Sequence, residues 1–273
     1  MKTGISTFIY GHYSIEEAIQ NISIAGYDSV EIWGGRPHAY RNDLREHEIR
    51  NIRNLIDDLG LQIISFDPAQ FGYPSSLCSP IKNIRMDSVR YIKDSTETAV
   101  RLGASIISVF PGHTLNNQDL DDGWERLADS LDRICEFAGH YNILVAIKPG
   151  NKYQTDLINT TIQAVDMIDQ LGFDNLGVLF DCGNAFIAGE DTASAIENLG
   201  DRLIAVHVND NDGKTDQKHI PGHGQFDFRS LIHALRLTLY EGIISADLGW
   251  DYTNNPDPAA IETQEYLYNL INR

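Results

Sequence analysis

Short apolar segments rich in β-branched residues recur along this chain, and a segment with helical periodicity follows each of them. The predicted strands are Thr3–Ile9, Ser29–Trp33, Leu61–Phe66, Ser105–Phe110, Ile143–Ile147, Leu176–Phe180, Leu203–Val208 and Ile243–Leu248. The predicted helices are Ala18–Ile22 after an S-I-E-E capping box at Ser14, Leu44–Leu59, Asp87–Leu102, Trp124–Ala138, Thr160–Leu171, Thr192–Leu199, Phe228–Tyr240 and Pro258–Ile271. Eight strand-helix units in series predict a single (β/α)8 barrel domain over residues 1–273.

A doubly wound open sheet is the alternative architecture for this order of strands and helices. Such a sheet usually carries a G-x-G-x-x-G turn after its first strand, and none follows Ile9. Barrels of about 250 residues commonly fold as one unit. The length of 273 residues therefore agrees with one barrel.

Composition and charge exclude several classes of partner. The chain is 42% hydrophobic and 22% charged, and it has no apolar run of the roughly 18 residues that a membrane span needs. With 39 Asp and Glu against 21 Lys and Arg, the net charge of −18 disfavours nucleic acid. No signal peptide is recognised, and Cys78, Cys135 and Cys182 lie far apart in the sequence, so we expect free thiols and a cytoplasmic protein.

Ionisable residues lie at the ends of the predicted strands, where a (β/α)8 barrel has its active site. They are Glu31, Asp67, His113, Lys148, Asp181, His207 and Asp247. A charged group that is buried at the end of a barrel strand costs folding free energy unless it is paired or bound to a metal. A purely structural ion pair between Lys148 and Asp181 or Asp247 is the simplest alternative to a functional site.

Five segments carry a resemblance to a known family. They are Gly26–Trp33 (GYDSVEIW), Asn175–Ala185 (NLGVLFDCGNA), Ala205–Asp210 (AVHVND), His219–Asp227 (HIPGHGQFD) and Gly242–Asp247 (GIISAD). In this order they resemble the xylose-isomerase-like TIM-barrel superfamily of sugar isomerases and epimerases, inosose and dehydroshikimate dehydratases, and DNA-repair enzymes of the endonuclease IV type. The resemblance covers nearly the whole chain, whereas no single motif fixes the reaction.

The resemblance implies a site for one divalent metal, held by a Glu, an Asp, a His and a Glu at the ends of strands five to eight. The matching positions here are Lys148, Asp181, His207 and Asp247. Asp181 and His207 carry over directly, and Asp247 keeps a carboxylate on a shorter side chain. These three ligands suit Mn, Zn, Co or Mg. Lys148 departs from the pattern, because an ammonium cannot ligate a cation.

Three interpretations of Lys148 are open. In the first, a metal is held by the three remaining side chains, and Lys148 is turned away or deprotonated. In the second, the ammonium replaces the metal as the positive charge that stabilises an enediolate. In the third, the amine is a nucleophile that forms a Schiff base with a carbonyl substrate.

Several residues near the predicted strand ends are candidates for substrate binding. They are His12, Trp33, His113, Asn184 and His219. Trp33 suits the apolar face of a sugar, although aromatic residues at a barrel mouth as often pack a lid. Asn184 could hold a sugar hydroxyl or merely cap a short helix. By resemblance, His113 and His219 match metal ligands of the multi-zinc endonucleases. Because other ligands of that cluster are replaced here, we expect them to bind substrate or loop backbone.

The predicted function is that of a sugar or cyclitol isomerase or epimerase that removes a proton next to a carbonyl through an enediolate. Asp247 is the predicted base, and Lys148 is the predicted acid or positive charge. A dehydratase or other lyase of the same superfamily and a non-catalytic sugar-binding barrel are the alternatives. An abasic-site endonuclease is disfavoured by the missing zinc ligands and the charge of −18. We expect a neutral sugar or polyol substrate, and a homo-oligomer is left open.

Overall fold

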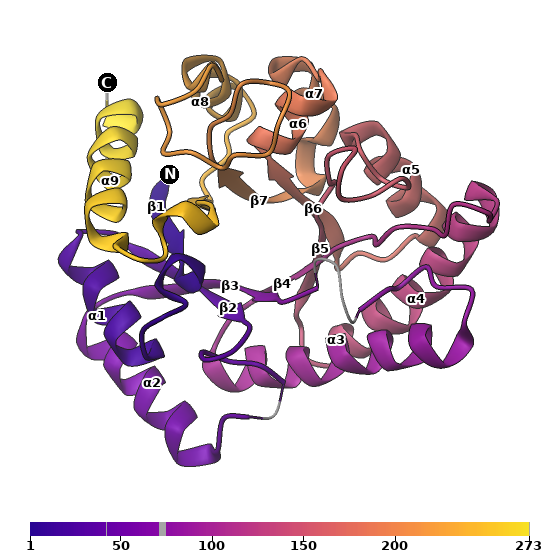
Figure 1. Ribbon diagram of the computed structural model, residues 1–273, viewed down its shortest axis with the longest axis horizontal. Coiled ribbons are helices and arrows are strands. Elements are labelled where there is room, and N and C mark those ends of the chain that lie inside the picture. Colours follow the sequence, from indigo (N-terminus) through magenta and orange to yellow (C-terminus); the bar gives the residue numbers. More distant parts are fainter. Residues whose placement is uncertain (42, 71–74, 273) are drawn as a thin grey trace.

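The computed structural model describes residues 1–41, 43–70 and 75–272, and in this part of the chain eight parallel strands close into a barrel (Figure 1). The strands are β1 (Lys2–Ser6), β2 (Ser29–Gly34), β3 (Gln62–Pro68), β4 (Ile106–Val109), β5 (Leu144–Ile147), β6 (Leu176–Asp181), β7 (Leu203–Val208) and β8 (Ile243–Ala246). Each strand pairs with the next one along the chain, and β1 closes the ring by pairing with β8, where Lys2 lies opposite Ile243. The predicted (β/α)8 barrel is confirmed.

Helices form an outer ring around this barrel (Figure 1). They are α1 (Ile15–Ile24), α2 (Glu46–Asp58), α3 (Lys82–Leu102), α4 (Leu120–Gly139), α5 (Thr161–Leu171), α6 (Cys182–Ala188), α7 (Thr192–Leu199), α8 (Phe228–Leu237) and α9 (Pro256–Asn272), with 3-10 turns η1 (Thr7–Tyr10), η2 (Gly200–Arg202) and η3 (Trp250–Tyr252). The capping box predicted at Ser14 is confirmed, because Ser14 and Glu17 each accept a hydrogen bond from the backbone N–H of the other. Within the described residues, none of these helices is both long and apolar enough to cross a membrane.

Side-chain caps set two element boundaries that differ from the predicted ones. The first strand ends at Ser6 rather than Ile9, because the Ser6 hydroxyl accepts a hydrogen bond from the Phe8 amide and starts η1. Helix α6 follows β6 without a loop, and its cap is Asp181 rather than Asn184, because the Asp181 carboxylate accepts a hydrogen bond from the Asn184 amide at 3.1 Å. The same capping contact orients the Asp181 side chain at the end of the barrel.

The barrel interior is filled in layers that follow the alternation of side chains along each strand. One buried layer is apolar and consists of Ile106, Ala146, Leu179 and Ala205. Side chains two positions apart point to the same face of a strand. The next positions toward the C-terminal ends of these strands are Ser108, Lys148, Asp181 and His207. A buried polar and charged layer therefore begins directly above the apolar one.

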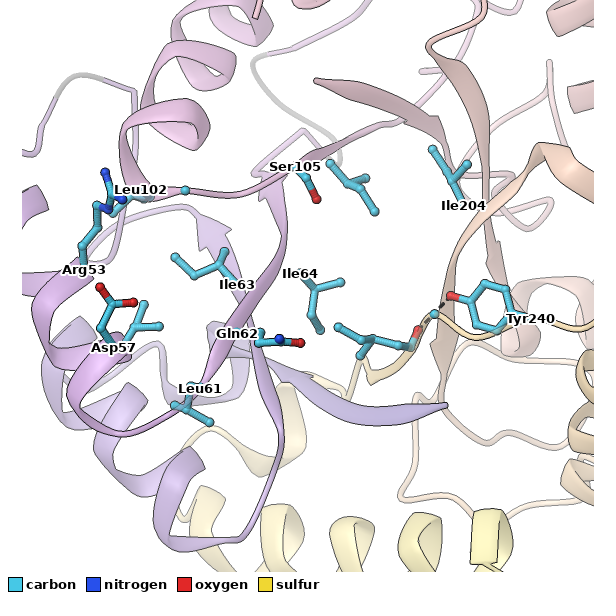
Figure 2. A pocket seen from close by; sticks show the side chains of 15 residues that line it. Arg53, Asp57, Leu61, Gln62, Ile63, Ile64, Leu102, Ser105, Ile204 and Tyr240 are labelled. Carbon is cyan, nitrogen blue, oxygen red and sulfur yellow. Dashed lines mark hydrogen bonds between the residues drawn. The ribbon is translucent and has the colours of Figure 1, made fainter. Parts of the chain in front are cut away.

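A cavity of about 500 Å³ opens at the other end of the barrel, where strands β3, β4, β7 and β8 begin (Figure 2). Isoleucines of the barrel wall, among them Ile64 and Ile204, line it together with Arg53 and Asp57 of α2. Active sites of (β/α)8 barrels form at the C-terminal ends of the strands. We therefore place the candidate active site at the opposite end.

Candidate active site

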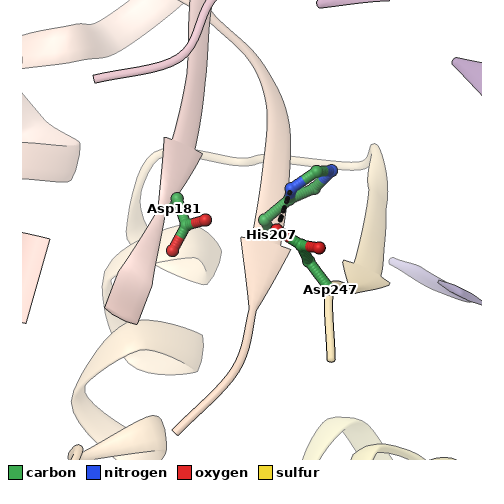
Figure 3. Close-up of side chains that lie close together, drawn as sticks. All are labelled: Asp181, His207 and Asp247. Carbon is green, nitrogen blue, oxygen red and sulfur yellow. Dashed lines mark ion pairs between the residues drawn. The ribbon is translucent and has the colours of Figure 1, made fainter. Parts of the chain in front are cut away.

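Four side chains that were predicted to be functional meet at the C-terminal end of the barrel. Lys148 follows β5, Asp181 ends β6, His207 lies in β7 and Asp247 follows β8, and all four are buried. Asp181 lies opposite His207 in the register of β6 and β7. Figure 3 shows Asp181, His207 and Asp247, whose ligand atoms all lie within 4.8 Å of one another. Their roles in catalysis or metal binding stay predictions.

The Lys148 ammonium lies among the three other side chains. Its Nζ is 2.6 Å from Asp247 Oδ2, 3.0 Å from Asp181 Oδ2 and 3.0 Å from His207 Nδ1. The contact with Asp247 is a well-aligned hydrogen bond, whereas the contact with Asp181 has ion-pair distance without hydrogen-bond alignment. Lys148 is therefore held chiefly by Asp247.

A second ammonium, that of Lys218, reaches the same carboxylate from the loop that follows β7. Its Nζ is 2.5 Å from Asp247 Oδ2 and 4.0 Å from Asp181 Oδ2, and 18% of its side chain is exposed. Lys218 was not among the predicted site residues. The candidate predicted in this loop was His219 of the adjacent H-I-P-G-H segment. The only local signal is a lysine within a polar loop, which by itself is usually a solvated residue.

The loop that carries Lys218 is anchored by one buried carboxylate. The backbone of Asp210 exchanges two hydrogen bonds with that of His219, at 2.9 and 2.8 Å. The Asp210 side chain accepts hydrogen bonds from the backbone amides of Asn211, Gly222, Gly224 and Phe226. A Cβ atom on Gly224 would lie 2.3 Å from Asp210 Oδ1, so only glycine fits there. The loop is therefore a fixed part of the site wall.

His207 is oriented by a buried carboxylate on the far side of the barrel. Its Nε2 lies 2.7 Å from Oε2 of Glu31 in β2, and Ser65 of β3 donates a hydrogen bond to the same Glu31 oxygen at 2.7 Å. Burial opposes a charge on the imidazole, but the Glu31 carboxylate outweighs it, and the pKa of His207 rises to about 9. The ring is therefore cationic at neutral pH.

Opposite charges at the site hold one another's pKa values away from the usual range. Burial opposes the charge on Lys148, yet the carboxylates of Asp247 and Asp181 hold its pKa well above the usual value. Burial likewise opposes ionisation of Asp247, but Lys148 and Lys218 hold its pKa well below the usual value. Two ammonium groups and the imidazolium of His207 thus face three carboxylates, those of Asp181, Asp247 and Glu31.

Asp181, His207 and Asp247 offer the oxygen and nitrogen ligands that a divalent metal prefers. The Lys148 ammonium, however, lies within hydrogen-bond distance of all three. A divalent cation about 4 Å from an ammonium is repelled by roughly 8 kcal/mol at an effective dielectric near 20. The three side chains therefore form a potential ligand set that does not fit a metal while Lys148 keeps this position.

A cavity of about 560 Å³ lies above the charged layer and reaches the surface. Lys148, Lys218 and Asp247 form part of its floor and wall, and Trp33 and Trp250 contribute apolar surface. Both tryptophans pack edge-on against Phe8, with ring centroids 5.2 and 4.5 Å away. Cavities of about 300 to 1,000 Å³ with a few converging polar groups are typical small-molecule sites. Polar groups and aromatic rings in the lining of one cavity suit a sugar.

Asp67 of β3 lies in the wall of the same cavity. Burial, reinforced by the nearby Glu31 carboxylate, raises its pKa, and Ser108 donates a hydrogen bond to its Oδ1 atom. Asp67 and Asp247 are therefore two carboxyl groups of one cavity whose surroundings shift their pKa values in opposite directions. The sequence placed Asp67 at a strand end but assigned it no role.

The other predicted substrate-binding residues lie outside the residues that line this cavity, except for Trp33. His12 is exposed, and His113 is exposed next to Asp156, with 3.3 Å between Nδ1 and Oδ2. His219 is partly buried and contributes its backbone to the loop anchor. Asn184 is buried and bridges Asn151 and the Pro149 carbonyl. Their substrate contacts stay predictions.

Comparisons with known proteins agree with this architecture. The sequence model of a family described as xylose isomerase-like TIM barrel matches residues 19–270. The chain is 29% identical to the fructoselysine 3-epimerase of Escherichia coli O157:H7 over 271 residues, which cover 99% of this chain and 98% of the relative. It is 25% identical to the 3-dehydro-D-guloside 4-epimerase of Escherichia coli K12 over 254 residues, which cover 89% and 90% of the two chains. The solved structure of a D-tagatose 3-epimerase-like protein has the same fold, with a TM-score of 0.86, 23% identity and coverage of 100% of this chain and 97% of that one.

Proposed function

We propose, from the premise that this chain belongs to the xylose isomerase-like TIM barrel family, that it is a sugar epimerase acting on a ketose or a ketose derivative. The epimerase names of both relatives support this reaction class. The observation that carries the proposal is the buried Asp247 carboxylate, which faces a sugar-sized cavity beside two ammonium groups.

Epimerisation next to a carbonyl needs a base, an acid and positive charge near two oxygens. The base takes the proton from the carbon next to the carbonyl, and the electron pair of that C–H bond forms a C=C bond. The π electrons of the carbonyl move to its oxygen, which gives an enediolate. Return of a proton to the opposite face inverts the carbon. Asp247 is the proposed base, and Lys148 is the proposed source of charge beside the oxygens.

Contact with two ammonium groups makes free Asp247 a weak base. A ketose that offers its own oxygens to Lys148 and Lys218 would draw both away from Asp247. The carboxylate would then regain basicity next to the substrate carbon. Proton abstraction would thus be coupled to substrate binding.

Two other roles of Lys148 lead to different chemistry. A Schiff base requires a neutral amine, whereas the neighbouring carboxylates keep Lys148 protonated. Borohydride added with fructoselysine should therefore leave no reduced adduct on Lys148, and such an adduct would establish covalent catalysis. A divalent metal, Mn, Zn, Co or Mg, at Asp181, His207 and Asp247 is the other alternative. It requires Lys148 to leave its present position.

The partner of this site is proposed to be a small sugar or polyol. The cytoplasmic location and the lack of nucleic-acid binding stay predictions, and the oligomeric state stays open. The three cysteines are buried and free, which is compatible with a reducing compartment.

Exchange of carbon-bound hydrogen in D2O tests the proposed function. Fructoselysine, D-psicose and L-ribulose are incubated with the unmutated protein, and proton NMR follows loss of the signal next to the carbonyl and growth of a second epimer. Asp247→Asn should slow both processes by about 100-fold or more, because it removes the base. Glu241→Gln, which changes an exposed carboxylate before β8, is the matched control and should leave both rates unchanged. Lack of exchange with every ketose would contradict the proposal.

A further inference from the structure

We propose that the ammonium groups of Lys148 and Lys218 together take the place of a divalent cation at this site, and that each binds one of two adjacent substrate oxygens. The inference deepens the proposed function and rests on it for the identity of the substrate oxygens. The replacement of the metal rests on geometry alone.

Lys148 Nζ lies among the three side chains that could ligate a metal. It lies 2.6 to 3.0 Å from one atom each of Asp247, Asp181 and His207, which is the set of atoms that could ligate a metal. Lys148 directly follows β5. The register of β5 is fixed by its pairing with β4 on one side and β6 on the other. The position of Lys148 is therefore set by the barrel itself.

Lys218 adds a second positive charge from an independent element. Its Nζ shares Asp247 Oδ2 with Lys148, and both side chains line the cavity. The carbonyl oxygen of Lys218 accepts a hydrogen bond from the Gly249 amide after β8, at 2.9 Å. The loop and the end of β8 are thus joined at the point from which the ammonium extends.

The backbone of Lys218 is held in a conformation that lysine rarely adopts. Its φ of +48° lies in the left-handed region, which glycine enters without steric cost. The loop contacts hold this strained backbone and carry the ammonium onto the buried Asp247 carboxylate.

Two ammonium groups on one carboxylate oxygen fit a substrate with two neighbouring oxygens. An enediolate from an α-hydroxy ketone has this pattern, because the former carbonyl oxygen and the adjacent hydroxyl oxygen lie on neighbouring carbons. A metal would chelate both oxygens at one centre. Here we assign one oxygen to each ammonium, and Trp33 and Trp250 line the same cavity. The expected substrate class is therefore α-hydroxy ketones, bound without a metal.

Metal analysis tests the replacement without reference to turnover. The full chain is loaded with Mn²⁺ or Zn²⁺, dialysed and analysed for metal by mass spectrometry, and Mn²⁺ binding is followed by calorimetry. The unmutated protein should retain far less than one metal per chain. Lys148→Glu, which restores a carboxylate, should bind Mn²⁺ stoichiometrically. Lys148→Ala, which only removes the ammonium, should bind it at least about tenfold more tightly than the unmutated protein. Stoichiometric metal in the unmutated protein would overturn the proposal, and so would folded variants that bind no more metal than it does.

Variants of Lys218 test how much its ammonium contributes to catalysis. Lys218→Met should lower kcat/KM about 100-fold, Lys218→Arg should recover part of it, and Lys214→Met in the same loop should change nothing. A chelator should not lower the exchange rate of the unmutated protein. Equal activity of Lys218→Met and Lys214→Met, or loss of activity with chelator, would overturn the ammonium pair. Absence of exchange with all ketoses would refute the proposed function, while the metal measurements would still decide the replacement.

Discussion

The imidazole of His207 and the carboxylate of Glu31 form a buried pair with 2.7 Å between Nε2 and Oε2, although 176 positions separate them in the sequence. The pair spans the barrel from β7 to β2. Because Nε2 faces Glu31, Nδ1 is turned toward Asp247 and Lys148. Glu31 thus fixes the orientation of the His207 ring, which contacts Lys148 and Asp247.

Glu31→Gln should destabilise the fold by about 3 kcal/mol, because it leaves a buried imidazolium without its counter-charge. Urea unfolding at neutral pH measures the loss. Ser65→Ala is the matched control, since it removes a neutral donor from the same Glu31 oxygen and should cost about 1 kcal/mol. Equal losses for the two variants would show that the charge of Glu31 contributes nothing beyond a hydrogen bond.

Asp210→Asn should loosen the loop that carries Lys218 while the barrel stays folded. Asparagine keeps the shape of the side chain but turns one acceptor into a donor. That donor would face the amides of Gly222 and Gly224, which now bind Oδ2. We expect faster amide exchange in these loop residues, measured by mass spectrometry, and at least tenfold lower kcat/KM. Asp212→Asn at the exposed part of the loop should leave both quantities near those of the unmutated protein, and a similar effect there would contradict the anchor.

The barrel and its strand-end residues were predictable because both depend on local pattern. Alternating strand and helix segments specify the order of elements, and parallel strands bring their carboxyl ends together. This reasoning placed Lys148, Asp181, His207 and Asp247 at one end of the fold, and the structure confirms that they meet. What they bind depends on distances of a few tenths of an ångström, which a sequence pattern does not contain.

Lys218 and the Glu31–His207 pair were not predictable for the same physical reason. The position of Lys218 depends on a left-handed backbone angle and on a loop folded around Asp210. The Glu31–His207 contact crosses the inside of the closed barrel. Both relationships exist only after distant segments have been brought together, so neither leaves a periodic signal in the sequence.

His38 should make the fold sensitive to mild acid. Its Nδ1 lies 3.0 Å from Thr7 Oγ1 and its Nε2 lies 3.1 Å from the Tyr10 carbonyl oxygen, and burial lowers its pKa below the usual 6.5. A lowered pKa means that folding favours the neutral ring. The resulting stability is present above pH 6.5 and is lost as the pH falls toward the pKa of the folded protein.

Thermal unfolding between about pH 7.5 and pH 5.5 should therefore show a loss of roughly 1 kcal/mol that His38→Gln lacks. The variant is expected to be less stable than the unmutated protein at the higher pH and to depend less steeply on pH. His47→Gln, which changes an exposed histidine in α2, should keep the full acid dependence. If all three proteins lose stability in parallel, His38 is not the titrating group.

Asp67 is predicted to be the second proton carrier of the epimerase. An inversion needs groups on two faces of the substrate carbon, and Asp67 and Asp247 lie in the wall of one cavity with opposite pKa shifts. In this scheme the ionised Asp247 removes the proton, and the protonated form of Asp67, which its raised pKa favours, returns one to the other face. The contribution of Asp67 should fall as the pH rises through its raised pKa, because only the protonated form can donate.

Asp67→Asn should separate hydrogen exchange with solvent from inversion of the carbon. Asp247 would still take up and return a proton on its own face, so deuterium from the solvent should enter the starting ketose with retention of configuration. Formation of the second epimer should fall about 100-fold. Proton NMR in D2O reads both rates in one sample, and Ser108→Ala, which removes only the hydrogen bond to Asp67, should lower the inversion rate to a smaller extent and leave the exchange rate unchanged. Equal loss of exchange and inversion in Asp67→Asn would instead make Asp67 a structural residue of the cavity wall.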